Sequence, residues 1–220
     1  MIKRMGLFQK RHDLTQSQFS AYWTKKHSPI VMQMHRFSHY IQNHCVDFLP
    51  CFTPNHPAHV LSGIAEMYWA TEAAMLEDFN AHDHINRLRQ DECEFMSNIS
   101  VCIVDESALL GEKSQVKLML CVSESDEVEA FELEDIQQVL PHLQGLQRSE
   151  TLRMINRPQL PAIQDIPERF YSLWFKQYQD VLADFSQPNW QQFYTQHFQK
   201  ISRVSIFMLH ALDIRTDEKC

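Results

Sequence analysis

The chain has 220 residues, of which 44% are hydrophobic and 22% charged, as in ordinary globular proteins. Its formal net charge of −8 makes a nucleic-acid or anionic-membrane partner unexpected, because both need a basic protein surface. We find no apolar run long enough to span a membrane and no signal-peptide pattern, so we expect a cytoplasmic protein without a membrane segment.

The first half of the sequence alternates strand-like and helix-like segments. Ile2 to Phe8 predicts a strand, and a capping-box pattern at Thr15 predicts a helix whose apolar positions continue to Met34. Pro29 can begin a second helical segment, since proline is favoured in a first helical turn. The pattern also predicts strands at Phe37 to Asp47, Gly63 to Ala70 and Ile99 to Glu106, and helices at Thr71 to Phe79 and Asp83 to Ser97. The resulting order, βαββαβ, is that of the ferredoxin-like unit.

The second half repeats this order with divergent residues. Lys3 aligns with Lys117 and Trp69 with Trp174, at offsets of 114 and 105 residues, and a linker is expected around Gly111. We therefore predict an α+β chain of two tandem ferredoxin-like βαββαβ domains, residues 1–108 and 115–216. Their sheets should face one another and form an intrachain dimeric α/β-barrel, because each open sheet face needs a cover.

One histidine stands within an apolar helical stripe. If the helix is continuous, His27 shares the face of Trp23 and Met34, and its ring points toward the sheet. A buried neutral imidazole can act there as general base or acid near pH 7. A structural core histidine is the alternative interpretation.

Strand 37–47 carries polar side chains on both of its faces. Adjacent residues point in opposite directions, so Tyr40, Gln42 and His44 share one face and Asn43 lies on the other. We expect the face of Tyr40, Gln42 and His44 to line the cavity, while a solvent-facing strand surface is the alternative.

The acidic residues Glu66 and Asp91 can each be interpreted as functional or as structural. Glu66 lies in an otherwise apolar strand, where burial is expected to raise its pKa and make it an acid or a partner for a histidine. A salt bridge at the sheet edge is the alternative. Asp91 lies in a charged helical segment that is also consistent with a solvated surface.

The first half contains the aromatic pair Tyr22-Trp23, followed by His27-Ser28-Pro29. This combination resembles the EthD family, whose pattern has an aromatic pair before His-x-Pro. The strand Tyr40 to His44 is similar to its Tyr-x-Gln-Asn-His strand. Gly63 to Trp69 and Arg89 to Phe95 are similar to a glutamate-containing strand and an Asp-Glu-x-x-Phe helix of the family. The resemblance covers roughly residues 1–108.

The second half departs from these motifs. The repeat places Ile136, Gln137 and Pro141 opposite Tyr22, Trp23 and His27. We therefore expect one functional site per chain, in the first half, with the second half serving mainly as the other wall of the barrel.

The resemblance implies a small-molecule barrel protein. Its relatives include cofactor-independent lyases, isomerases and dehydratases acting on small cyclic or aromatic oxygenated compounds. Alternatives are a quinol-type monooxygenase and a non-catalytic binding or sensing barrel, and homo-oligomerisation stays open. The candidate catalytic residues are His27, Tyr22, Glu66 and His44, and the candidate substrate-binding residues are Trp23, Tyr40, Gln42, Asn43, Trp69 and Asp91.

We expect neither a metal nor a cofactor. The histidine clusters lack a recognised ligand spacing, and the sequence contains no GxGxxG, P-loop or CxxCH motif.

Overall fold

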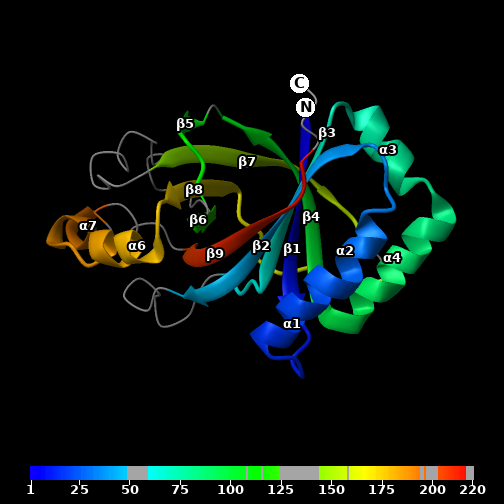
Figure 1. Ribbon diagram of the computed structural model, residues 1–220, viewed down its shortest axis with the longest axis horizontal. Coiled ribbons are helices and arrows are strands. Elements are labelled where there is room, and N and C mark those ends of the chain that lie inside the picture. The colour runs from blue at the N-terminus through cyan, green and yellow to red at the C-terminus, as the bar shows by residue number, and fades with distance from the viewer. Residues whose placement is uncertain are drawn as a thin grey trace.

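The computed structural model describes residues 1–48, 59–107, 109–114, 116–123, 144–157, 159–193, 196 and 203–216. Within these residues, eight antiparallel strands close into one barrel in the order β4-β1-β3-β2-β9-β6-β8-β7, and β7 pairs again with β4 (Figure 1). These strands are β1 (Ile2–Lys10), β2 (Phe37–Phe48), β3 (Gly63–Trp69), β4 (Met96–Glu106), β6 (Val116–Ser123), β7 (Gly145–Ile155), β8 (Arg169–Phe175) and β9 (Arg203–Thr216). The short β5 (Leu110–Gly111) pairs with the start of β7.

The two halves of the chain share this barrel, as predicted. Strand β2 of the first half pairs with β9, so that His44 lies opposite His210. Strand β4 pairs with β7, so that Val104 lies opposite Thr151. The two half-sheets thus face one another across a common interior, and the predicted α+β barrel is confirmed.

Helices cover the outer faces of the barrel (Figure 1). In the first half these are α1 (Gln16–Tyr22), the π-helix η1 (Trp23–His27), α2 (Ser28–Val31), α3 (Glu72–Phe79) and α4 (His82–Phe95). In the second half they are α6 (Tyr178–Phe185) and α7 (Pro188–Phe193). The residues that the repeat places opposite Tyr22, Trp23 and His27 lie outside the described residues. Among the described helices, none is both long and apolar enough to cross a bilayer.

The first helix begins where its sequence indicates and stays helical through Ser28. The Thr15 hydroxyl accepts a hydrogen bond from the Gln18 backbone, and the Gln18 side chain accepts one from the Thr15 backbone, which completes the capping box. The helix does not break at Ser28. It widens instead into one π-turn, in which the Ser28 amide bonds to the Trp23 carbonyl five residues before it. Trp23 and His27 both remain buried on the inner face.

Strand alternation separates the interior into layers. On β1, Met5 and Leu7 point into the barrel and Phe8 packs toward the first-half helices. On β6, Met119 and Cys121 point into the same interior. Side chains that follow one another along a strand therefore reach different sites, one inside the barrel and one between the sheet and the helices.

Candidate functional site

His27 lies in the layer between the sheet and the first-half helices, at the end of the π-turn. Its ring is 4% exposed, and Nδ1 lies 2.8 Å from Oδ2 of Asp91 on α4. The other carboxylate oxygen of Asp91 accepts a hydrogen bond of 2.9 Å from the Tyr22 hydroxyl. Three of the predicted site residues thus form one connected group.

The ionisation of Asp91 determines the protonation of this group. Burial opposes ionisation, but hydrogen bonds from His27 and Tyr22 lower the pKa of Asp91 below its usual value. An ionised carboxylate only accepts hydrogen bonds, so Nδ1 of His27 must carry a proton. In the neutral imidazole, Nε2 is then the free acceptor. Burial and the neighbouring Asp91 raise the pKa of Tyr22 to about 12, which keeps its hydroxyl protonated.

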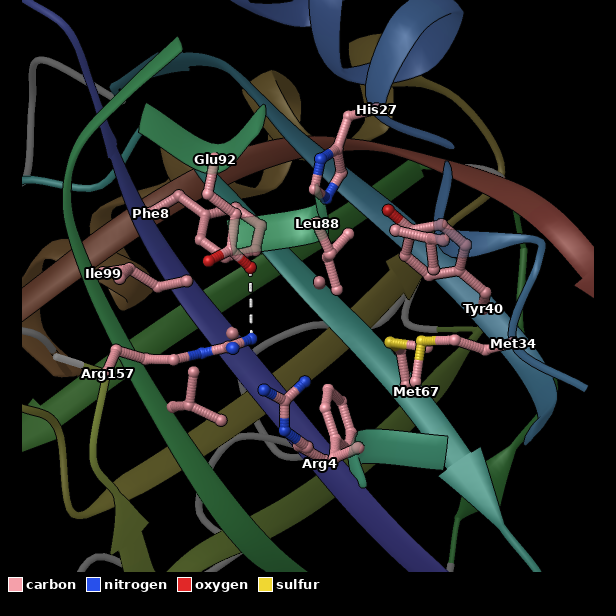
Figure 2. Close-up of a pocket in the computed structure, with 15 residues that line it drawn as sticks. Arg4, Phe8, His27, Met34, Tyr40, Met67, Leu88, Glu92, Ile99 and Arg157 are labelled. Atoms are coloured by element: carbon pink, nitrogen blue, oxygen red, sulfur yellow. Dashed lines mark hydrogen bonds and ion pairs between the residues drawn. The ribbon is translucent and has the colours of Figure 1, made fainter. Parts of the chain in front are cut away.

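A small pocket adjoins the His27 ring. Its cavity volume is about 20 Å³, enough for one water-sized group. Figure 2 shows the His27 ring pointing into this space. The surrounding wall is mostly apolar and includes Met34, Met67, Leu88 and Ile99.

The opposite wall of the same pocket carries charges that sequence reasoning missed. Arg4 from β1, Glu92 from α4 and Arg157 from the segment after β7 line it, and all three are buried. Arg157 pairs with Glu92 at 3.1 Å (Figure 2). The sequence feature that indicates this charged wall is Arg4, a charged residue within a largely apolar strand. The second half therefore contributes Arg157 to the first-half pocket, in addition to forming a barrel wall.

Tyr40, Gln42 and His44 face the helices, so the expectation that this face lines the barrel is wrong. The Tyr40 hydroxyl accepts hydrogen bonds from Trp23 Nε1 at 3.0 Å and from Gln42 Nε2 at 2.8 Å. Oε1 of Gln42 lies 3.1 Å from Nε2 of His44. Trp23 of η1 supplies one of these partners and the other polar side chains of β2 supply the rest, which explains why polar side chains can lie on this buried face. Of the three strand residues, Tyr40 lines the His27 pocket.

Burial sets the ionisation of this second group. It lowers the pKa of His44 to about 4, with a smaller effect from His210, so the ring is neutral near pH 7. It also raises the pKa of Tyr40 to about 12. The group therefore acts as an uncharged hydrogen-bonded network beside Trp23.

Glu66 lies inside the barrel, on the other side of the sheet from His27. Its carboxylate pairs with Lys3 at 3.0 Å and with Lys117, the two lysines that the predicted repeat aligns. Although burial opposes ionisation, the charges of Lys117 and Lys3 hold the pKa of Glu66 well below its usual range. The expected raised pKa is therefore wrong, because the sequence did not show that two lysines converge on this carboxylate.

Asn43 belongs to this interior group. Its amide donates to Glu66 Oε1 at 2.8 Å and to the Ile64 carbonyl at 3.0 Å. A cavity of about 260 Å³ adjoins Asn43 and Glu66, and Lys117 and Trp174 also line it. The candidate residues thus divide between two faces of the sheet.

Trp23 and Trp69 both lie in the core on the helix side. Trp23 contacts the ring of His44 with 4.5 Å between centroids. Trp69 donates to Asp78 Oδ2 at 2.8 Å. Its ring lies 5.8 Å from that of Phe79, which lines the His27 pocket, but Trp69 itself does not line it. Trp69 and His27 are therefore not brought together.

Metal-binding groups of three or more His, Cys, Asp or Glu side chains do not occur in the part of the chain that the structure describes.

Part of the first half of the chain matches a known family. The EthD domain model matches residues 11–98, which include Tyr22, His27 and Asp91. Comparison with curated protein sequences gave no match.

Solved structures share the whole barrel. An anthrone oxidase-like protein matches with a TM-score of 0.61 at 9% identity, over 96% of this chain and 92% of its own. A provisionally assigned monooxygenase from Fusobacterium nucleatum matches with a TM-score of 0.57 at 11% identity, over 98% of both chains. A mutant chlorite dismutase from Candidatus Nitrospira defluvii matches with a TM-score of 0.50 at 9% identity, over 94% of this chain and 90% of its own. Residues 11–98 of this chain thus match the EthD domain, within an α/β barrel whose fold these solved structures share.

Proposed function

We propose that the protein binds a small oxygenated ring compound beside His27 and transfers a proton at it without a cofactor, in a lyase, isomerase or dehydratase reaction. The observation that carries this proposal is that His27, which lines the pocket, pairs with Asp91. The Asp91 carboxylate orients the ring and leaves Nε2 as the basic atom.

The pair can move a proton in both directions. Nε2 accepts a proton from a carbon or hydroxyl of the ligand, and the imidazolium that forms is stabilised by Asp91. Nε2 then returns the proton to another ligand atom. The Tyr22 hydroxyl holds the far oxygen of Asp91, so the carboxylate stays directed at Nδ1. The apolar wall excludes water that would compete for this proton.

The pocket must widen to admit a ring, because its present volume of about 20 Å³ matches one water. Met34 and Met67 form part of the wall. Methionine side chains are unbranched and change rotamer easily, so they are suited to this adjustment. We expect the ligand to displace these two side chains while the Asp91–His27 bond is kept.

A second candidate is cofactor-free oxidation of a quinol. It is favoured by the names of two similar barrels, the anthrone oxidase-like protein and the provisional monooxygenase. The same Nε2 would take the proton of a quinol hydroxyl, which makes the ring easier to oxidise by oxygen.

The test uses two simple probes. Hydrogen–deuterium exchange at the α-carbon of cyclohexanone, followed by NMR, reports proton transfer, and oxygen uptake with hydroquinone reports the second candidate. His27→Gln should lower the active reaction by roughly 10² to 10⁴-fold with little change in melting temperature. His12→Gln is the matched control, because His12 is exposed.

Two results would contradict the proposal. One is a wild-type protein that accelerates neither reaction above buffer. The other is an unchanged rate in His27→Gln together with a lower melting temperature, which would make His27 structural and favour a binding barrel.

A further inference from the structure

Arg4 is a buried cation that forms no ion pair with the described residues, although the carboxylate of Glu92 lines the same pocket. Arg4 is 6% exposed and lines the His27 pocket. In the part of the chain that the structure describes, no hydrogen bond or ion pair reaches its guanidinium group. Among the described residues it forms a cation–π contact with the Phe79 ring, with 4.2 Å from the guanidinium carbon to the ring centroid.

The charges around Arg4 do not balance. Arg157 lies over the same Phe79 ring at 5.7 Å, and its own guanidinium pairs with Glu92 at 3.1 Å. The pocket wall thus holds two cations and one anion. Burial, and then the charge of Arg157, lowers the pKa of Arg4, yet arginine stays protonated in proteins because its ordinary pKa is so high. An unpaired buried charge is costly, and such sites are normally neutralised by a partner.

We propose that Arg4, assisted by Arg157, forms an anion subsite that binds the carboxylate of the ligand. The guanidinium group offers a planar fork of N–H donors that fits a carboxylate in a bidentate manner. Figure 2 shows Arg4 and Arg157 pointing into the pocket from the wall opposite His27. A ring acid bound with its carboxylate at Arg4 therefore extends toward Nε2 of His27. This placement of the ring rests on the proposed function, whereas the anion subsite does not.

The substrate class that follows is a small aromatic or alicyclic carboxylic acid. Its carboxylate replaces the missing anion, and its ring occupies the apolar part of the pocket. A free small anion could also neutralise Arg4, so the experiment must distinguish a free anion from the carboxylate of a ring acid.

The experiment measures binding of benzoate, benzamide and formate by calorimetry at constant chloride. Benzamide has the shape of benzoate without its charge, and formate has the carboxylate without the ring. The wild-type protein should bind benzoate at least about tenfold more tightly than either.

Arg4→Met should weaken benzoate binding roughly 10- to 100-fold and leave benzamide binding unchanged. Its melting temperature should not fall, because the substitution removes an unpaired buried charge. Arg4→Lys should keep part of the preference for benzoate over benzamide, since it keeps the charge and loses the fork. It serves as the test if Arg4→Met does not fold. Arg36→Met, at an exposed ion pair, is the matched control.

Equal binding of benzoate by the wild-type protein and Arg4→Met, or equal binding of benzoate and benzamide by the wild type, would overturn the subsite. If formate bound as tightly as benzoate does, the proposed ring-acid ligand would be overturned, and the subsite would instead bind a free small anion. Benzoate binding that depends on Arg4 but not on His27, without proton exchange, would support the subsite while refuting the proposed proton transfer.

Discussion

Glu66→Gln should strongly destabilise the barrel. Glu66 is 2% exposed and its carboxylate pairs with both Lys3 and Lys117. In the variant Lys3 keeps Glu106 at 2.5 Å, but Lys117 loses the one ion pair that the described residues provide for it. Leaving one buried charge unpaired costs about 3–5 kcal/mol. We expect a loss near the lower end, about 3 kcal/mol, because glutamine can still bond to Asn43.

The measurement is urea unfolding at pH 7 followed by circular dichroism. Glu77→Gln is the control, since its pair with Arg36 is exposed, and it should cost less than about 1 kcal/mol. Adding Lys117→Met to Glu66→Gln removes the unpaired cation and should restore about 1–3 kcal/mol. A loss below about 1 kcal/mol in Glu66→Gln would refute the assignment of a buried ion cluster.

The acid limb of stability gives an independent check on Glu66. Its folded pKa lies below its unfolded value of about 4.3, so its contribution is present above that pH and is lost as the pH falls toward the folded pKa. Below about pH 4.3 the wild-type protein should therefore lose stability more steeply than Glu66→Gln. Parallel curves would contradict this.

Two further predictions concern the helix side of the sheet. The pKa of His44 is lowered to about 4, first by burial and then by His210, so its neutral form stabilises the fold above about pH 6.5 and this contribution is lost as the pH falls from 6.5 to 4. His44→Leu should flatten that limb, by no more than about 3 kcal/mol, and histidine NMR titration should show no protonation of His44 near pH 6. Gly63→Ala should cost about 1–3 kcal/mol in urea unfolding, because the new Cβ would lie 2.5 Å from the buried Trp23 ring. The exposed Ser17→Ala control should change stability by less than about 0.5 kcal/mol, and a similarly small change in Gly63→Ala would show that Trp23 can move.

The sequence predicted the fold well because its signals are local and repeated. The capping box at Thr15 and the period of the first helix specify that helix, and the alignment of Lys3 with Lys117 specifies the barrel partner. Proline at position 29 suggested a break, whereas the chain absorbs it in a π-turn. A sequence pattern does not distinguish a helix break from a π-turn, since both accommodate a proline that has no backbone N–H to donate.

The candidate site was predicted in part. Tyr22, His27 and Asp91 converge, but they come from α1, η1 and α4, and no local pattern specifies how α4 packs against the other two. Alternation showed that Asn43 and His44 point apart, and it could not show which of them faces the helices. The sequence did not predict a role for Arg4, because a charged residue on a strand usually indicates a solvated face. In the structure, that face of β1 is covered by α4.

The protonation state of the His27 ring tests the proposed catalytic pair most directly. Nitrogen-15 NMR of histidine-labelled protein distinguishes a ring protonated at Nδ1 from one protonated at Nε2. We predict that neutral His27 carries its proton on Nδ1 and that Asp91→Asn shifts the population toward Nε2–H, because an amide can donate to Nδ1. A wild-type His27 protonated at Nε2, with Nδ1 bare against Asp91, would contradict the assignment of Nε2 as the base.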